Sequence, residues 1–243
     1  MTRTPRPPAL VAVAHGSRDP RALHTVSALL DRVRARRPGL DVHLGHIELN
    51  APLLPDTLTT LGDRPAVLVP LLLSRGHHVT RDIPAASAGR FPVADPLGPH
   101  PLLATALHDR LLESGWTHPT PVVLASAGSR DPSARTDTTQ MASLLAIRLG
   151  VPVLPATPAT LQQTLTTLRS PAIASYFTAP GRFATQTAAT APGIAAQPLG
   201  THPAMAALIL QRYDEVRYPR GAGNCATSHN APAPATQQVT AHA

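Results

Sequence analysis

Histidines and a glutamate in the first half of the chain stand where apolar segments end. His15 and Glu48 each follow directly on such a segment, and His77 and His78 close the loop after a third one, Ala66–Leu73. Each segment is typical of a buried parallel strand, and the carboxyl ends of parallel strands share one edge of a sheet. Imidazole and carboxylate together suit a divalent metal such as Fe²⁺, Co²⁺, Ni²⁺ or Zn²⁺, and three protein ligands leave coordination positions open. We therefore expect an open metal site, whose imidazoles can also accept protons.

Each of these residues also has a purely structural interpretation. His15 can be a loop residue that hydrogen-bonds to the backbone, and Glu48 can cap the short helix that begins after it. Because His77 and His78 are adjacent, we expect only one of them to face the site. The delivery of these residues to one edge by three separate strands favours the functional interpretation.

The second half of the chain repeats the first without these residues. The segment Val11–Pro20 returns as Val122–Pro132, with Ala127 at the position of the first histidine. Alignment of the glycines that follow the third strands places Phe183 at the position of His78, and no acid stands near the place equivalent to the glutamate. Two shorter motifs recur in the same order, Asp56–Leu61 as Gln163–Leu168 and Pro96–Pro101 as Pro198–Pro203. A repeat of this length suits two tandem domains that share one working site, in the first half.

Apolar and amphipathic segments alternate along both halves, which predicts parallel sheets covered by helices. The predicted strands are Ala9–Ala14, Val42–Ile47, Ala66–Leu73, Phe91–Ala94, Val122–Ser126, Val151–Leu154 and Ala172–Phe177. The predicted helices begin at Pro20, cover Leu53–Leu61, about His78–Ala88 and Thr136–Leu149, and close the two halves at His100–Ser114 and His202–Val216. We expect domains at residues 1–115 and 116–218, followed by a disordered tail at 219–243 that contains the one cysteine.

The composition narrows the classes of partner. All 21 basic side chains are arginines, and the net charge of +7 favours an anionic partner. The arginines are scattered and aromatic residues make up only 3%, which favours a small polycarboxylate or phosphate ligand over nucleic acid. The longest apolar run, Ala66–Leu73, is shorter than a membrane span. We expect a cytoplasmic monomer without membrane or nucleic-acid partners.

Three motifs in the first half resemble those of the class II tetrapyrrole chelatases, the sirohydrochlorin cobaltochelatase and ferrochelatase (CbiX/SirB-like) family. They are the His-Gly-Ser that begins at His15, the segment Ile47–Pro52, and the long run Val69–Pro84 with its Gly-His-His-Val-Thr-Arg-Asp-Ile-Pro. The resemblance implies an α/β fold of two tandem flavodoxin-like, chelatase-type domains. The second domain would be degenerate and would form the other wall of the substrate cleft.

The resemblance also implies roles for single residues. His78 matches a metal ligand, His15 a metal ligand or proton acceptor, and Glu48 a group that binds metal or takes a pyrrole proton, whereas His77 occupies a variable position of the motif. The implied substrate contacts are Asn50, Leu73, Ser74, Arg75 and Gly76, and Arg18 and Arg81 border the site. Arg75 departs from the family, which has a small residue there.

The implied reaction is insertion of Fe²⁺ or Co²⁺ into sirohydrochlorin, in siroheme or cobalamin biosynthesis. The divalent metal, Ni²⁺ included, is then a substrate, and no organic cofactor is expected. One alternative is a carrier that binds metal or tetrapyrrole without catalysis. Another is a histidine-dependent phosphatase, although Ala14 precedes the histidine where such phosphatases have arginine.

Overall fold

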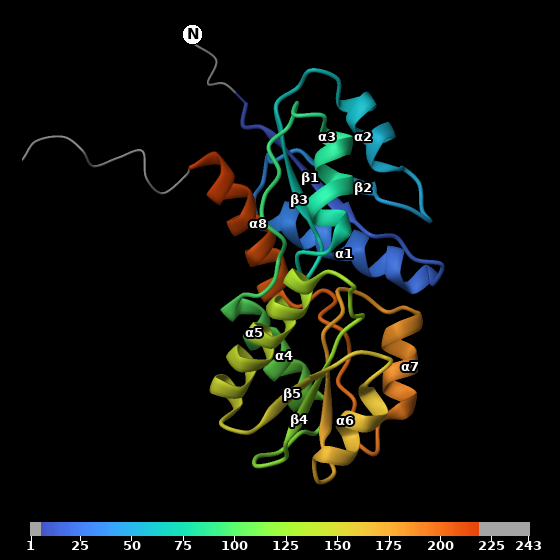
Figure 1. The fold of residues 1–243 in the computed structure, drawn as a ribbon. Coiled ribbons are helices and arrows are strands. Elements are labelled where there is room, and N and C mark those ends of the chain that lie inside the picture. Colours follow the sequence, from blue (N-terminus) through green and yellow to red (C-terminus); the bar gives the residue numbers. More distant parts are fainter. Residues whose placement is uncertain (1–5, 219–243) are drawn as a thin grey trace, which may run out of the picture.

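The computed structural model describes residues 6–218, and the predicted tail at 219–243 lies outside them. Each half contains a parallel three-stranded sheet with helices packed against it, and the two halves are stacked along the long direction of the molecule (Figure 1). The strand orders are β2-β1-β3 and β5-β4-β6. The strands are β1 (Ala9–Ala14), β2 (Val42–His46), β3 (Ala66–Pro70), β4 (Val122–Ala125), β5 (Val153–Ala156) and β6 (Ala172–Ser175). The predicted α/β fold with two tandem domains is confirmed.

The helices alternate with these strands, as the sequence pattern predicts. They are α1 (Pro20–Arg36), α2 (Leu54–Leu61), the π-helical turn η1 (His78–Asp82), α3 (Ile83–Ser87), α4 (Pro101–Glu113), α5 (Pro132–Leu149), α6 (Leu161–Thr167), α7 (Arg182–Thr190) and α8 (Pro203–Arg217). None of them is both long and apolar enough to cross a membrane, as far as the described residues go.

The middle strands β1 and β4 are apolar and buried along their whole length. This is the burial expected for parallel strands that have helices on both faces and a partner on both sides. Each middle strand therefore delivers its following loop to the carboxyl edge of its sheet. There Asp19 and Asp131 cap α1 and α5 by accepting from the backbone N–H groups of Arg21 and Ser133.

Three predicted elements differ from the structure at their ends or in kind. The helix predicted at His78–Ala88 begins with the wide π turn η1 and becomes α-helical only at Ile83. The strand predicted at Phe91–Ala94 is reduced to one bridge, in which Val93 pairs with Leu68. The helix predicted from Thr136 begins earlier, at Pro132. Period-based prediction detects the element but not its cap, because Pro132 and the Ser and Thr residues after it carry little apolar signal.

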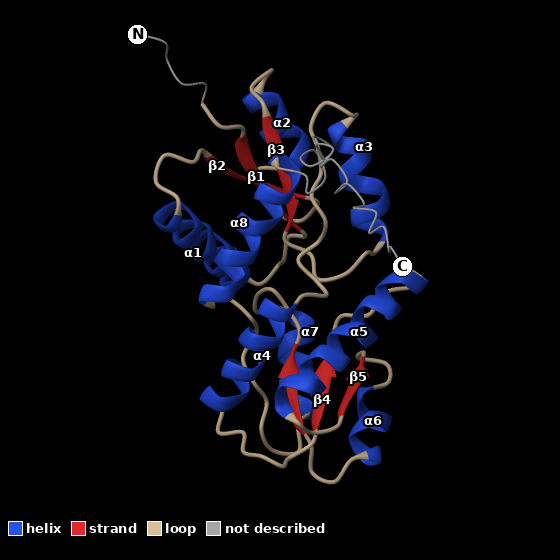
Figure 2. Cartoon of the chain, turned by 90° about the vertical axis from the view of Figure 1, so that its left-hand side faces the viewer, coloured by secondary structure: helices blue, strands red, loops and turns tan. Residues whose placement is uncertain are grey.

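The closing helices are exchanged between the halves, contrary to the expectation that each closes its own. Helix α4 packs against α5 and β6 of the second half, and α8 packs against α1 and β3 of the first (Figures 1 and 2). Arg37 of the first half donates two hydrogen bonds to Asp214 of α8, at 2.6 and 2.7 Å. One apolar core consequently contains residues from both sheets. The exchange follows from tertiary packing, since either helix has the apolar residues to cover either sheet.

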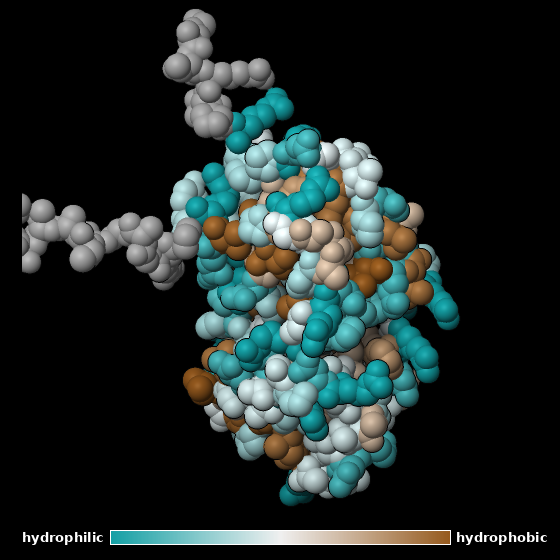
Figure 3. All heavy atoms as spheres, turned by 45° about the horizontal axis from the view of Figure 1, so that its top comes forward, coloured by the Kyte–Doolittle hydropathy of each residue, from teal (hydrophilic) through white to brown (hydrophobic). Residues whose placement is uncertain are grey.

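The surface does not gather its apolar side chains in one place. Large exposed apolar residues occur on several different elements. On the face seen in Figure 3 they form separate groups among hydrophilic residues. Leu49, Leu53 and Phe183 belong to this set, and each of them stands in or next to a loop at the carboxyl edge of a sheet.

Candidate functional site

The turn after β1 and the loop after β2 are packed tightly together. Gly16 has a φ of +100°, and a Cβ atom there would lie 1.8 Å from the carbonyl oxygen of Glu48, so only glycine fits. The side-chain oxygen of Asn50 accepts a hydrogen bond from the backbone N–H of Ser17 at 2.7 Å. This approach brings the His15 Nδ1 atom within 3.7 Å of the Glu48 Oε1 atom. Two of the three residues predicted to act together are thus neighbours.

The loop that carries Glu48 has unusual backbone geometry. Leu49 has a φ of +66°, a left-handed conformation that costs a non-glycine residue free energy, and its side chain is exposed. The N–H of Asn50 donates to the carbonyl of Glu48 at 2.8 Å and tightens the turn. Asn50 therefore has a clear structural part in positioning the site, beside the substrate contact predicted for it.

His78 approaches the same place from the loop after β3. Its ring centroid lies 4.7 Å from that of His15, with the two planes at 87°. The Nδ1 atom of His78 lies 2.6 Å from Asp82 Oδ2, within η1. A carboxylate accepts only, so Nδ1 carries the proton and Nε2 keeps its lone pair for a metal or a proton. The sequence analysis assigned Asp82 no role; the signal available was its spacing of four residues from the histidine.

These side chains form an open group. The exposed fractions are 45% for His15, 51% for Glu48 and 33% for His78. Within residues 6–218, no three His, Cys, Asp or Glu side chains are already arranged to hold a metal ion. The ligands lie close together without forming a closed cage, and their role as metal ligands stays a prediction. His77 is 75% exposed and lies 3.5 Å from the other oxygen of Asp82, turned away from His15.

The loop that leads to His78 is held by polar groups of the second half. The Tyr176 hydroxyl donates to the Leu73 carbonyl at 2.8 Å, and the Thr178 hydroxyl donates to the Leu71 carbonyl at 3.0 Å. Burial raises the pKa of the Tyr176 phenol, so that it stays a donor. A Cβ at Gly98 would lie 2.0 Å from that hydroxyl, which explains the glycine.

Arg75 contributes the third connection between this loop and the second half. Its guanidinium group donates to Asp137, with an Nη2–Oδ1 distance of 2.6 Å, and its backbone N–H donates to the same carboxylate at 2.7 Å. Asp137 on α5 is only 1% exposed, and its hydrogen bond raises the pKa of the Arg75 side chain. The arginine that departs from the family pattern therefore serves as an inter-half ion pair. A substrate contact, as predicted from the sequence, would have to share a guanidinium that Asp137 already holds.

The remaining predicted substrate residues are dispersed around the group. Leu73 packs partly buried against the core, the Ser74 carbonyl accepts from the Gly76 N–H at 3.0 Å, and Gly76 faces Ser129 Oγ of the second half at 3.6 Å. Arg81 is exposed on η1. Arg18 lines an open groove between the halves. Their contacts with substrate stay predictions.

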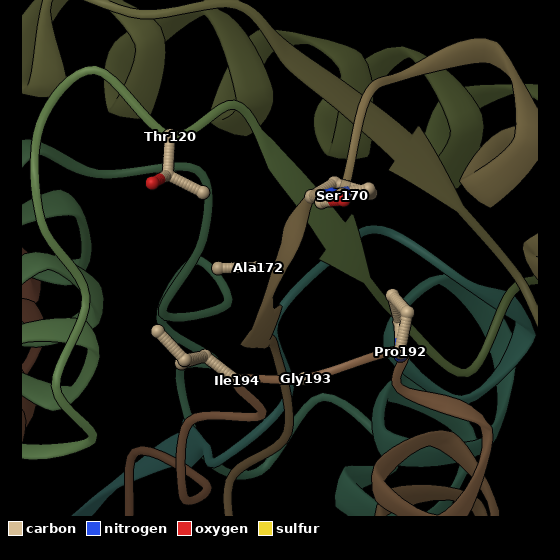
Figure 4. A pocket seen from close by; sticks show the side chains of 7 residues that line it. Thr120, Ser170, Ala172, Pro192, Gly193 and Ile194 are labelled. Atoms are coloured by element: carbon tan, nitrogen blue, oxygen red, sulfur yellow. The ribbon is translucent and has the colours of Figure 1, made fainter.

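A separate pocket lies at the opposite edge of the second sheet. It has a volume of about 200 Å³ and is lined by Thr120, Ser170, Pro171, Ala172, Pro192, Gly193 and Ile194 (Figure 4). These residues precede strands β4 and β6 rather than follow them. In parallel sheets ligands bind at the carboxyl edge, and the pocket contains no titratable side chain. It offers no chemistry of its own.

Comparison with known proteins agrees with this geometry. The CbiX family model matches residues 9–114, which span the three loops described above. The first half is a CbiX-type domain. The predicted resemblance to the class II chelatases is thereby confirmed.

Relatives of the CbiX-type domain are named as chelatases. A sirohydrochlorin cobaltochelatase of Methanococcus maripaludis is 35% identical over 79 residues, which are 31% of this chain and 55% of that protein. A sirohydrochlorin ferrochelatase of Bacillus subtilis is 29% identical over 149 residues, 56% of this chain and 57% of that protein. The chain thus spans about half the length of these relatives.

Solved structures extend the likeness of fold over both halves. The sirohydrochlorin chelatase SirB from Bacillus subtilis subspecies spizizenii, in complex with cobalt, superposes with a TM-score of 0.72 and 24% identity, and covers 88% of this chain and 97% of that one. A multi-domain Deinococcus radiodurans protein with structural similarity to chelatases gives a TM-score of 0.67 at 21% identity, covering 89% of this chain and 56% of that one.

Proposed function

We propose that this protein inserts a divalent metal ion into sirohydrochlorin. The observation that carries the proposal is the meeting of His15, Glu48 and His78 at one sheet edge, with 4.7 Å between the two imidazole rings and 3.7 Å between His15 and Glu48. The names of the relatives of the CbiX-type domain support the same activity. The metal ion is a substrate that this group receives and passes on.

Insertion replaces two pyrrole N–H protons of the macrocycle by one metal ion. His15, Glu48 and His78 hold the ion through few bonds, since each is a third or more exposed, and water completes its shell. The hydrogen bond to Asp82 fixes the His78 ring and leaves Nε2 as its free nitrogen. As the metal leaves for the macrocycle, Nε2 and the neighbouring His15 or Glu48 accept the two protons.

The surroundings suit a macrocycle that is apolar on its face and anionic at its rim. Leu49 exposes its side chain directly beside Glu48 and can lie against such a face. Arg18 and Arg81, both predicted to border the site, can meet ionised carboxylates at the rim. Leu73 to Gly76 would then form the edge of the cleft nearest His78.

The ligand set does not choose one metal. Imidazole and carboxylate bind Fe²⁺, Co²⁺ and Ni²⁺ in a similar way, and the relatives carry both the cobaltochelatase and the ferrochelatase name. We propose Fe²⁺ or Co²⁺ as the substrate metal, for siroheme or cobalamin biosynthesis respectively. A monomeric, cytoplasmic enzyme that needs no organic cofactor and binds neither nucleic acid nor membrane stays a prediction.

The test is the rate of metal insertion. Purified protein is mixed with sirohydrochlorin and either Co²⁺ or Fe²⁺ under anaerobic conditions, and the absorbance change is compared with the reaction without protein. We expect a clear acceleration with at least one metal. Binding of both substrates without acceleration would instead support the carrier alternative, and no binding of sirohydrochlorin would overturn both.

A further inference from the structure

An open groove lies between the turn after β1 and the start of α7. Its volume is about 730 Å³, and its lining residues are Ser17, Arg18, Asp19, Arg21, Arg182, Thr185 and Gln186. The first four belong to the first half and the last three to the second. Figure 1 shows the start of α1 in blue beside α7 in orange, where the two halves meet.

The groove carries a net positive charge. Its one carboxylate, Asp19, is held by Arg21, whose Nη2 lies 2.6 Å from Oδ2, and this hydrogen bond lowers the pKa of Asp19. The pair is therefore neutral as a unit. Arg18 and Arg182 have no carboxylate within salt-bridge distance among residues 6–218. Thr185 and Gln186 add neutral donors to the same wall.

Two contacts fix the second half against this side of the groove. The Arg21 guanidinium reaches the Thr185 hydroxyl at 3.4 Å. Gly181, directly before α7, lies so close that a Cβ there would be 3.6 Å from Ser17 Oγ. The Arg182 guanidinium is also placed over the Phe183 ring, 5.8 Å from its centroid. The wall that carries Arg182 is therefore held in place beside the first half.

The groove opens next to the predicted metal site. Ser17 lines it and follows His15 by two residues, in the same tight turn. A planar ligand seated over the two imidazoles would extend its rim into the groove. Planar guanidinium groups bind carboxylates through paired hydrogen bonds.

We propose that this groove is a subsite for carboxylate groups at the rim of the tetrapyrrole, and that Arg182 of the second half is a substrate-binding residue. This proposal rests on the proposed function, because it takes sirohydrochlorin as the ligand. It gives the second half a direct part in binding, although that half has no metal-binding side chains at the equivalent positions. The same guanidinium groups could attract free phosphate, so the source of the anion is part of the test.

The experiment compares Arg182→Gln with Arg169→Gln. Both remove one exposed positive charge from the second half, but Arg169 lies at the opposite edge of the sheet, beside strand β6. Sirohydrochlorin binding without metal is measured by fluorescence quenching, and insertion by absorbance. For Arg182→Gln we expect Kd and KM to rise about fivefold, the scale of one partly exposed charged contact, with kcat nearly unchanged. The control should match the wild type.

Further arms separate the possible outcomes. The lysine variant Arg182→Lys should recover most of the affinity, and added salt should weaken the wild type more than Arg182→Gln. Inorganic phosphate at millimolar concentration should not compete with sirohydrochlorin; strong competition would assign the groove to phosphate. If the wild type inserts metal and Arg182→Gln retains wild-type Kd and KM, the subsite is overturned and the proposed function stands. If the wild type neither binds nor turns over sirohydrochlorin, both fall.

Discussion

The turns after β1 and β4 have the same backbone but different side chains. Gly16 and Gly128 both have positive φ, +100° and +77°. The hydroxyls of Ser17 and Ser129 each accept from the N–H of the helix-capping aspartate two residues later, both at 3.1 Å. His15 in the first turn corresponds to Ala127 in the second. The turn is thus kept by backbone requirements alone, and the chemistry depends on one side chain that the turn does not need.

The loops after β3 and β6 extend this comparison. Gly76 faces Ser129, and Gly181 faces Ser17, both at 3.6 Å to the hydroxyl oxygen, so each loop packs on the turn of the other half. The first loop carries His78, and the second carries the exposed Phe183 at the equivalent place. What the second half has instead is a set of polar groups aimed at the first loop. A duplicated domain that has lost its ligands can thus still hold those of its partner.

The largest expected effect comes from the histidines that distinguish the halves. His15→Ala and His78→Ala should each lower the insertion rate by about 100-fold or more, since a ligand and a base are lost together. Both side chains lie in open loops, so the unfolding free energy should change little. Steady-state insertion assays and urea unfolding measure the two quantities. His77→Ala serves as the control, and full activity in both variants would refute the proposed site.

Asp82 tests whether the orientation of the His78 ring matters. Asp82→Asn keeps the size but removes the charged acceptor 2.6 Å from Nδ1. The rate of insertion or the metal affinity should fall by about 10- to 100-fold, as for other groups that orient a metal-binding histidine. Isothermal titration with Co²⁺ and the insertion assay provide the two readings. Equal metal affinity and rate in variant and wild type would show that the ring is held by other contacts.

The ion pair between the halves should affect stability as well as rate. Asp137→Ala leaves Arg75 without its partner and removes a buried carboxylate, which should lower the unfolding free energy by about 1–3 kcal/mol. Tyr176→Phe removes one hydrogen bond from the same loop and should cost about 1 kcal/mol. Urea unfolding measures both, and insertion should slow in both because the His78 loop loses its supports. Variants that are destabilised but insert at the wild-type rate would limit the role of the second half to folding.

The smallest effect concerns the histidines that cap the exchanged helices. The Nδ1 atoms of His100 and His202 accept from the backbone N–H groups of Leu102 and Ala204. Burial, with a further contribution from Arg212, lowers the pKa of His100 below its ordinary value of 6.5. The unfolded chain then takes up the proton more readily, so this stabilisation is complete above about pH 6.5 and is lost as the pH falls below it.

Replacement of this cap by a side chain that does not titrate isolates the effect. Serine also caps helices, so His100→Ser should retain α4 but lose part of the decrease in stability between pH 7 and pH 5. Urea unfolding at several pH values, compared with the wild type, measures the difference. An unchanged pH profile would mean that His100 does not contribute to it.

Most of the fold and the centre of the site could be predicted from the amino-acid sequence. The strands are continuous apolar runs, and parallel strands bring their carboxyl ends to one edge whatever the details of packing. His15, Glu48 and His78 were therefore expected to meet, and the structure places the three residues in one group. The repeat with Ala127 and Phe183 was likewise readable, because it depends only on residue order.

The remaining features depend on contacts between distant parts of the chain. Arg75 could not be paired with Asp137 from the sequence, because their contact depends on how the halves dock. Helices α4 and α8 have apolar faces that would cover either sheet, so only tertiary packing decided their exchange. Arg182 reaches the groove beside His15 for the same reason. Local periodicity determines which faces must be buried, whereas the choice of partner for each face is a property of the whole folded chain.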